Sequence, residues 1–574
     1  MRSQLLKPII KTMKRFKTLI VLLSILCLIS GCHKTEETDD RITEVHTQQL
    51  ETEAFISTIN VNGHTVYIYQ PKDIMRCDLI NYGYSAPLLM VFADGQMSEE
   101  EAARFICDKG IDRIAQKNGG FVIFVNPLKS WDKEEHGIYK AIQAKTMVGQ
   151  TGFAHGLLYS EEIQEYYIFA SPAATCLYGY GKGADYIAGE YLKQTKGTSS
   201  MSSLGSDDIT ITAAVLEKLN TVPVIEDREI IIVSCGNSSA IDEEIQKQSD
   251  RFYSSSDPFE QTYEEYIAGF QRWNGKLSTT FYPGKDGIRM EPLVFKVNTS
   301  PDNSVIRTSS YELGAVVFTK EDSSHKRPLL LCFHGGGDTA IATASIAGWP
   351  QIAAENDLIL CAIEMHTRTT ATETIEVIDQ LKELYEIDVS RIYATGFSMG
   401  GIKTWDLYQE YPEIFAALAP MGATVSVGMN TQFRNAPTVN EEVMVPVFYS
   451  GGENSQLQEL PFQGWTCVSR INYLFQVNRI ETPFDLSLGN RSDWTDTVYG
   501  HEGDIVEELT DESHPESLTT IRYYYSEDGN IYTALCSIRN HQHEIRPFTC
   551  QKAWEFMKQF SRSADGSILI EPSN

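Results

Sequence analysis

One serine with a glycine two residues away on each side is the strongest candidate for chemistry in this sequence. Ser398 lies between Gly396 and Gly400, after an apolar, β-branched run and before a helical pattern over 402–411. A serine on so tight a strand-to-helix turn needs neighbours without a Cβ, because the chain is crowded there. The positive end of the helix dipole would then lie where an oxyanion develops. The spacing favours Ser398 as the nucleophile of an acyl transfer, and an accidental glycine turn is the alternative.

Such a serine needs a base, and the last two histidines are the candidates. His541 and His543 follow a hairpin pattern and precede the last helical pattern. Alternate residues of an extended segment point in opposite directions, so one of the two is predicted to be the base, and we favour His543. A His-x-His pair can also bind zinc, but its spacing from Cys536 and Cys550 fits no common pattern. We predict no metal and no cofactor. Two other histidines are expected at the surface or against substrate: His366 and His501.

The remaining catalytic groups are an acid and the donors of an oxyanion hole. For the acid we predict Glu453, which ends a late strand pattern after two glycines, although a solvated loop carboxylate would look the same. Three aspartates in a polar insertion are less suitable: Asp493, Asp496 and Asp504. A glycine-rich loop over 334–337 follows a strand pattern directly. It predicts backbone donors from Gly335 and Gly336, with the Met399 amide as the second element of the hole.

The elements that would position these residues alternate between strand and helix. Strand patterns over 328–333, 358–364 and 445–450 are separated by helical patterns. Such alternation predicts a parallel sheet with helical crossovers, that is, an α/β fold. The order along the chain of serine, acid and histidine is the order found in the α/β-hydrolase fold.

The first half of the chain repeats these landmarks. The matching segments are 92–95 with 333–336, 179–183 with 396–400, and 233–237 with 449–453. In the first copy Gly181 stands in place of the nucleophile, Asn237 in place of the acid, and Ser255 in place of the base. We therefore predict two α/β-hydrolase-like domains in tandem, a degenerate, non-catalytic one over 56–285 and a catalytic one over 290–565. Two unrelated α/β domains are the alternative.

The N-terminal segment predicts export. Basic residues precede an apolar run over 19–29, and two small residues come directly before Cys32. This pattern resembles a bacterial lipoprotein signal, so we predict a signal peptide over 1–31, lipidation of Cys32 and a flexible polar tether over 32–55. A plain signal peptide or a signal anchor is the alternative, and Met13 is an equally good start.

Length and composition agree with an exported, multidomain protein. A chain of 574 residues is too long for one ordinary core and predicts two domains or more. The net charge of −29 argues against nucleic acid or an anionic membrane surface as partner, so membrane attachment is expected through the lipid alone. The eleven cysteines include no Cys-x-x-Cys pair, so we predict no disulfide framework.

The second half resembles a known group of enzymes. Residues 310–560 are similar to secreted esterases related to polyhydroxybutyrate depolymerases, feruloyl esterases and acetyl xylan esterases. The similar segments are 396–405, 411–420 and 554–560. The resemblance implies ester hydrolysis and a histidine shortly before the closing helix, which fits His543. The family usually has Asp where Glu453 stands, and 454–540 is longer than in the compact enzymes.

The sequence thus predicts a serine carboxylic-ester hydrolase, lipid-anchored outside the cytoplasm at a bacterial cell surface. Its substrate would be a small-molecule or polysaccharide ester, such as acylated plant polysaccharide or a phenolic ester. A prolyl-oligopeptidase-like serine peptidase would share the fold and the triad, but no β-propeller repeat is visible. A non-catalytic surface binding lipoprotein is the third reading, and it suits residues 56–285 better than the second half.

Overall fold

The computed structural model describes most of the chain beyond its N-terminal segment. The described residues are 46–71, 84–131, 137–138, 141–142, 168–193, 211–273, 276–279, 287–320, 325–336, 340–364, 366–423, 440–455, 459–460, 465–481 and 503–571. The predicted signal peptide and Cys32 lie outside them, as do Asp493, Asp496 and His501. Among the described residues, no helix combines the length and apolar character needed to cross a membrane.

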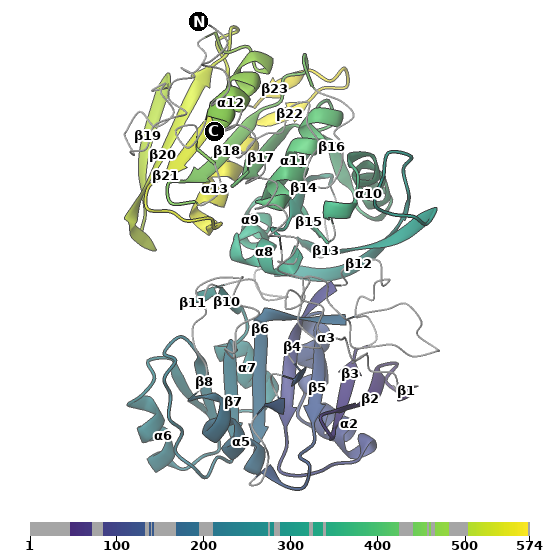
Figure 1. Cartoon of the computed structure of the whole chain (residues 1–574), viewed down its shortest axis with the longest axis vertical. Helices are drawn as coiled ribbons and strands as arrows, with labels where there is room; N and C mark the ends of the chain where they lie inside the picture. Colours follow the sequence, from purple (N-terminus) through teal and green to yellow (C-terminus); the bar gives the residue numbers. More distant parts are fainter. Residues whose placement is uncertain are drawn as a thin grey trace, which may run out of the picture.

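The first half of the chain builds a nine-stranded mixed sheet, in the lower part of Figure 1. Its order is β1-β2-β3-β5-β4-β6-β7-β8-β9. The strands are β1 (His46–Gln49), β2 (Phe55–Val61), β3 (His64–Gln70), β4 (Tyr84–Phe92), β5 (Phe121–Val125), β6 (Ile168–Tyr180), β7 (Ala213–Glu217), β8 (Ile231–Cys235) and β9 (Phe252–Ser255). Strands β1, β2, β3 and β5 pair antiparallel, and the pairs from β5 through β9 are parallel. Because β1 pairs with β2, the predicted flexible tether is wrong for 46–49.

The second half builds a ten-stranded mixed sheet. Its order is β12-β13-β15-β14-β16-β17-β18-β21-β20-β19. The strands are β12 (Ile288–Asn298), β13 (Ser310–Lys320), β14 (Arg327–Phe333), β15 (Ile359–Ile363), β16 (Ile387–Phe397), β17 (Ala417–Met421), β18 (Val447–Gly452), β19 (Ile505–Asp511), β20 (His514–Tyr525) and β21 (Ile531–Ile538). The pairs from β15 through β21 are parallel, and the strands at both edges pair antiparallel.

Helices connect the parallel strands of both sheets, and one further helix follows the last strand of each sheet (Figure 1). In the first half they are α2 (Glu99–Asp108), α3 (Ile111–Lys117), α5 (Lys182–Tyr186), which continues as a π-helix over Ile187–Tyr191, α6 (Ser239–Gln246) and α7 (Phe259–Tyr266). In the second half they are α8 (Ala340–Ile346), α9 (Trp349–Asn356), α10 (Ala371–Leu384), α11 (Met399–Glu410), α12 (Trp465–Val477) and α13 (Pro547–Met557). Central strands such as β14 and β15 are buried along their whole length, which explains their continuous apolar sequences. The predicted α/β fold is confirmed.

The two sheets share the connectivity of their central strands. The run β3-β5-β4-β6-β7-β8 has the same connections and directions as β13-β15-β14-β16-β17-β18. The backbone hydrogen bonds at the strand ends also correspond, because Lys218 N donates to Cys235 O and Gly422 N donates to Ser450 O. Cys235 therefore matches Ser450, and the predicted match of 233–237 with 449–453 is wrong by one residue.

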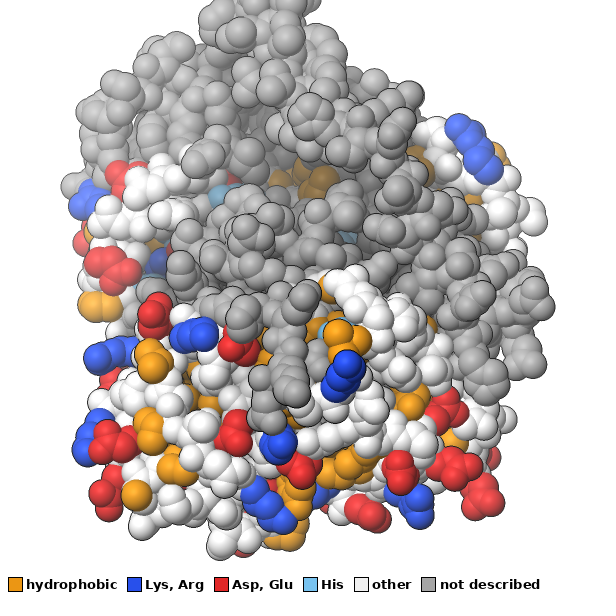
Figure 2. Space-filling view, turned by 60° about the horizontal axis from the view of Figure 1, so that its bottom comes forward, with side chains coloured by type: hydrophobic (Ala, Val, Ile, Leu, Met, Phe, Trp, Pro, Cys, Tyr) orange, Lys and Arg blue, Asp and Glu red, His pale blue; other side chains and the backbone are white. Residues whose placement is uncertain are grey.

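Helix α8 joins the two halves. All of its residues are buried, and it lies against β4 and β6 of the first sheet as well as β14 of its own. One hydrophobic cluster accordingly includes residues of both halves, among them Leu88, Leu177 and Ile341. Figure 2 views the molecule from the side of the nine-stranded sheet, where acidic and basic side chains are mixed over the surface. The first half is thus bound to the second through the helix that follows the predicted oxyanion loop.

Candidate active site

The turn that carries Ser398 has the strained geometry expected of a nucleophile elbow. Ser398 links β16 to α11 with φ 54° and ψ −112°, a backbone conformation that residues other than glycine rarely adopt. A Cβ on Gly396 would lie 2.3 Å from backbone atoms of Gly400, and one on Gly400 would lie 2.1 Å from Phe333 O. Both flanking glycines are therefore required by close backbone contacts, as the spacing predicted.

His543 lies directly against this serine. Its Nε2 is 2.8 Å from Ser398 Oγ, within hydrogen-bond distance. The ring also packs on Phe397, with 4.6 Å between the ring centroids. Gly422 leaves room for the imidazole, because a Cβ there would lie 3.2 Å from His543 Cε1 and its φ is +62°. The structure thus brings together the predicted serine and the favoured histidine.

The carboxylate at the other side of the ring belongs to Glu459, and the choice of Glu453 was wrong. Glu459 Oε1 accepts a hydrogen bond from His543 Nδ1, and its Oε2 accepts one from Gly452 N at 3.0 Å. The side chain is buried and also contacts Ser455 Oγ. Glu453 instead accepts from the Asn540 amide at 2.8 Å, on the loop that leads to the histidines.

The physical reason for this error is the path of the chain after β18. The prediction placed the acid on the first residue after the strand, but the later residue Glu459 is the one that contacts His543 and the strand end at Gly452. A Cβ on Gly451 would lie 3.0 Å from Glu459 Cβ, so the paired glycines mark this close return rather than the acid itself. The only sequence signal was that Glu459 is the next acidic residue after Glu453.

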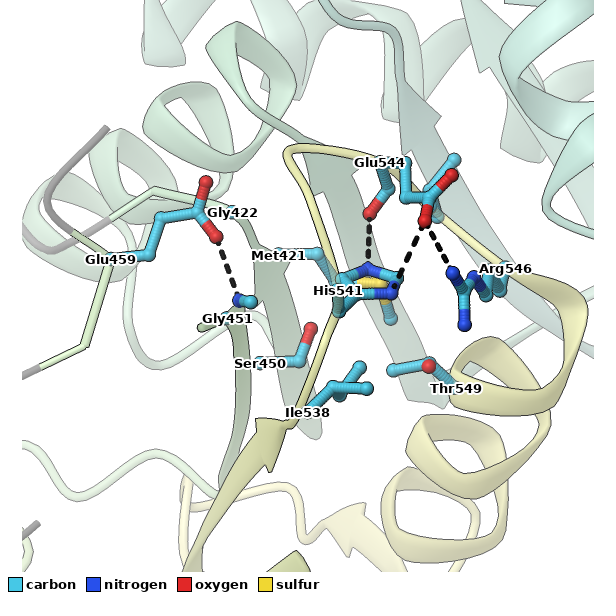
Figure 3. Close-up of a pocket in the computed structure, with 12 residues that line it drawn as sticks. Met421, Gly422, Ser450, Gly451, Glu459, Ile538, His541, Glu544, Arg546 and Thr549 are labelled. Carbon is cyan, nitrogen blue, oxygen red and sulfur yellow. Dashed lines mark hydrogen bonds and ion pairs between the residues drawn. The ribbon is translucent and has the colours of Figure 1, made fainter. Parts of the chain in front are cut away.

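Among the described residues, the His541 ring has its hydrogen bond and ion-pair contact with Glu544 of its own loop, and it has none with Ser398. Its Nε2 lies 2.9 Å from Glu544 O, and its Nδ1 lies 3.5 Å from Glu544 Oε1. Burial, followed by the neighbouring Arg546, lowers its pKa. Figure 3 shows His541, Glu544 and Arg546 on one side of a small polar pocket and Glu459 on the other. Within the described ranges, no three His, Cys, Asp or Glu side chains are arranged to hold a metal ion.

The predicted oxyanion loop lies beside the elbow. A Cβ on Gly335 would lie 3.2 Å from Phe397 Cδ1, and a Cβ on Gly336 would lie 2.5 Å from Met399 Sδ. Met399 is the first residue of α11, so its amide has no acceptor within the helix. The structure therefore brings Gly335, Gly336 and Met399 together near Ser398, while Gly337 lies outside the described residues.

Two buried histidines lie at this loop: His334 is its first residue, and His366 contacts the His334 carbonyl. Burial lowers the pKa of His334 to about 4, and it also lowers the pKa of His366, to which the neighbouring His334 contributes. Both imidazoles are therefore neutral near pH 7. The expectation that His366 is at the surface or against substrate was wrong, because its side chain is buried.

At the corresponding turn of the first half, the Asp94 side chain lies beside Gly181. Gly181 has φ 59° and ψ −123°, close to the values of Ser398. Asp94, which matches Gly335 in sequence, accepts a hydrogen bond from Lys182 N at 2.8 Å, and a Cβ on Gly181 would lie 2.4 Å from Asp94 Oδ1. Lys182 matches Met399, so a carboxylate lies where the second half has room for an oxyanion.

The groups predicted to replace acid and base in the first half serve as structural bridges. The Asn237 side chain accepts from Leu219 N at 2.7 Å and donates to Leu216 O at 3.0 Å. It matches Gly452, following the corrected strand register. Ser255 Oγ lies 2.8 Å from Thr262 Oγ1, at the start of α7.

Comparison with known proteins finds one similar curated relative. No model of a known protein family matches the chain. A bifunctional acetylxylan esterase/xylanase of Neocallimastix patriciarum is 27% identical over 150 residues, which cover 25% of this chain and 21% of that protein. The chain thus matches about a fifth of the length of this relative. The predicted resemblance to acetyl xylan esterases is confirmed by this match.

Solved structures of esterases are also similar to the chain. An acetyl xylan esterase from Aspergillus awamori has a TM-score of 0.33 at 12% identity, covering 46% of this chain and 99% of that protein. A ferulic acid esterase has a TM-score of 0.23 at 13% identity, covering 33% of this chain and 86% of that protein.

Proposed function

We propose that this chain is a serine carboxylic-ester hydrolase with Ser398 as nucleophile, His543 as base and Glu459 as the acid. The observation that supports the proposal most strongly is that the His543 imidazole contacts the serine with one ring nitrogen and the carboxylate with the other. Nε2 of His543 lies 2.8 Å from Ser398 Oγ, and Nδ1 contacts the buried Glu459 carboxylate. A hydroxyl is a weak nucleophile near neutral pH, and an adjacent, oriented base is what activates it.

In the proposed reaction, Ser398 Oγ attacks the ester carbonyl carbon while His543 Nε2 takes the hydroxyl proton. The Glu459 carboxylate holds the Nδ1–H tautomer and stabilises the imidazolium that forms. The tetrahedral oxyanion accepts from the amides of Gly335, Gly336 and Met399. His543 then gives its proton to the leaving alcohol, which leaves an acyl-serine. His543 then takes a proton from a water molecule as this water attacks the acyl-enzyme, and it returns the proton to Ser398 Oγ as the acid is released.

Burial supports Glu459 in this role. Its oxygens accept from Gly452 N and Ser455 Oγ as well as from His543, so the carboxylate is held in one orientation. A buried carboxylate with several donors is rigid and orients its partner ring.

For the first half, we propose a degenerate α/β-hydrolase domain over 56–285, in tandem with a catalytic domain over 290–565. The shared strand connectivity and the near-identical turns at Gly181 and Ser398 support a common fold. The glycine at the elbow and the Asp94 carboxylate beside it support the loss of catalysis.

We propose that the protein is a lipoprotein, anchored outside the cytoplasm through Cys32 after removal of residues 1–31. The basic, apolar and small residues before this cysteine support the proposal. Cys32→Ser should then release the protein from the membrane fraction. Retention of this variant with an uncleaved N-terminus would identify a signal anchor instead.

For the substrate, we propose esters of acylated plant polysaccharide or of phenolic acids, with acetyl esters foremost. The matched relative's name, acetylxylan esterase, supports this choice. The test is hydrolysis of acetylated xylan, a feruloyl ester, a longer acyl ester and a prolyl peptide by the full chain and by Ser398→Ala. Ester cleavage that needs Ser398 is expected, and cleavage of the peptide alone would replace the esterase by a peptidase.

A further inference from the structure

A pair of buried imidazoles contacts the backbone of the glycine-rich loop. His334 begins the loop, directly after β14, and His366 is the first residue of a short 3-10 turn, His366–Arg368, after β15. The two rings meet edge to face, with 4.5 Å between their centroids. Neither ring contacts Ser398 or His543 through any hydrogen bond of the described residues, so their place in the site needs another explanation.

Each imidazole donates to one carbonyl of the loop. His366 Nε2 lies 2.7 Å from His334 O, and His334 Nδ1 lies 2.7 Å from Gly335 O. Because a carbonyl oxygen only accepts, the proton must be on Nε2 of His366 and on Nδ1 of His334. Within the described part of the chain, His366 Nδ1 and His334 Nε2 have no hydrogen-bond partner, as expected for the bare nitrogens of neutral rings.

These two bonds determine where the loop amides point. In a trans peptide the C=O and the following N–H point in opposite directions, and the described chain contains no cis peptide. With His334 O held by His366, the Gly335 N–H must point away from that ring. Because Gly335 O is bound by the His334 ring, the Gly336 N–H must point away from the His334 ring. The carbonyls that would otherwise be free to rotate are thus fixed by the histidines.

The far end of the loop is attached to the same segment. Glu364, directly after β15 and buried, accepts from Ala340 N at the start of α8 at 3.0 Å. Its second oxygen lies 3.5 Å from His334 Nε2. Glu364 and His366 therefore contact the two ends of the chain between β14 and α8, and the loop is positioned by the end of β15.

We propose that His366 is a positioning residue of the oxyanion hole, acting by fixing the peptide that presents the Gly335 amide. The inference rests on the proposed function. His366 does not touch the reacting atoms, so its removal should weaken binding of the oxyanion while substrate binding stays unchanged.

The test uses two variants of the full chain, H366L and H366Q, because a glutamine amide can place a donor near the position of Nε2. For p-nitrophenyl acetate hydrolysis, H366L should lose about 10–100-fold in kcat with little change in KM, part of the effect of losing one oxyanion donor. Its affinity for phenylboronic acid, which forms a tetrahedral adduct on serine, should fall by the same factor as kcat/KM. H366Q should recover most of both losses. If H366L does not fold, H366N takes its place, because the asparagine side chain is too short for its amide to reach His334 O.

The outcomes separate this inference from the proposed function. Wild-type kcat in folded H366L or H366N overturns the inference alone, and so does an equal loss in H366Q and H366L. A loss confined to KM would also overturn it. If hydrolysis by the wild type does not depend on Ser398, the proposed function fails and the positioning role fails with it.

Discussion

The turns at Ser398 and Gly181 have nearly the same backbone conformation, but only the first carries a side chain that can act as a nucleophile. The φ/ψ values are 54°/−112° at Ser398 and 59°/−123° at Gly181, so the two turns differ by 5° in φ and 11° in ψ. In both, the glycine two residues later approaches the end of a central strand, where a Cβ would lie 2.1 Å from Phe333 O or 1.9 Å from Phe92 O. The same close contact between helix and strand therefore accompanies this turn in both halves, with a serine at its centre in one and a glycine in the other.

The difference between the halves lies in what fills the space above the elbow. In the second half, the matching position is Gly335, which has no side chain. In the first, the Asp94 carboxylate occupies it and accepts from Lys182 N, as a substrate oxyanion would from Met399 N. The first elbow thus has this shape with a glycine at its centre, and an internal carboxylate accepts from its exposed amide.

The largest expected effect is the loss of kcat when the nucleophile or the base of the second half is removed. Ser398→Ala should lower kcat about 10⁶-fold, as should His543→Ala, because the two act as one unit. His541→Ala should affect folding more than kcat, since His541 contacts Glu544 rather than the serine. Steady-state ester hydrolysis with a thermal unfolding control checks this. A larger kcat loss in His541→Ala than in His543→Ala would reverse the assignment of the base.

The next effect concerns the acid that the first half lacks. Glu459→Gln should lower kcat by roughly 10³–10⁴-fold, because the imidazole loses its tautomer and its stabilising charge. Glu453→Gln is the matched control and should stay near wild type, since Glu453 contacts the Asn540 amide. The measurement is kcat of both variants at saturating substrate. A larger loss of kcat in Glu453→Gln than in Glu459→Gln would identify Glu453 as the acid.

A pH effect on stability is expected from His334, which is buried in the second half. His334 matches Ala93 of the first half, and burial lowers its pKa to about 4. Below the ordinary pKa of 6.5, the unfolded chain takes up a proton that the folded protein does not. The free energy of unfolding should therefore fall between pH 6.5 and 4, by roughly 3 kcal/mol for this group. His334→Asn keeps a donor for Gly335 O and should lose this part of the pH dependence in urea unfolding; an unchanged profile would contradict it.

The smallest effect tests the filled elbow directly. Gly181→Ser should destabilise the protein by about 1–3 kcal/mol, because its Cβ would clash with Asp94 at a strained φ. Asp94→Gly alone should cost about 1 kcal/mol through the lost acceptor for Lys182 N. The double variant should be more stable than the sum of the two single changes allows, measured by thermal unfolding. Strict additivity would show that Asp94 does not occupy this space.

Sequence patterns were enough where chemistry imposes a local spacing. Gly396, Ser398 and Gly400 follow from one turn, and His543 follows from its place between a hairpin and the last helix. Glu459 could not be predicted, because its position depends on how far the chain runs beyond β18 before it returns. The same limit explains the one-residue error at Asn237, since a strand pattern does not determine its register with the neighbouring strand.

Labelling by a fluorophosphonate probe, with the modified residue mapped by mass spectrometry, tests most directly whether Ser398 is the nucleophile. We expect label on Ser398 in the wild type, none in Ser398→Ala, and none in Ser398→Ala with Gly181→Ser, because Asp94 lies at the first elbow and Ser255 stands in place of a base. Label on any residue between 56 and 285, or a wild type labelled at a residue other than Ser398, would refute this assignment.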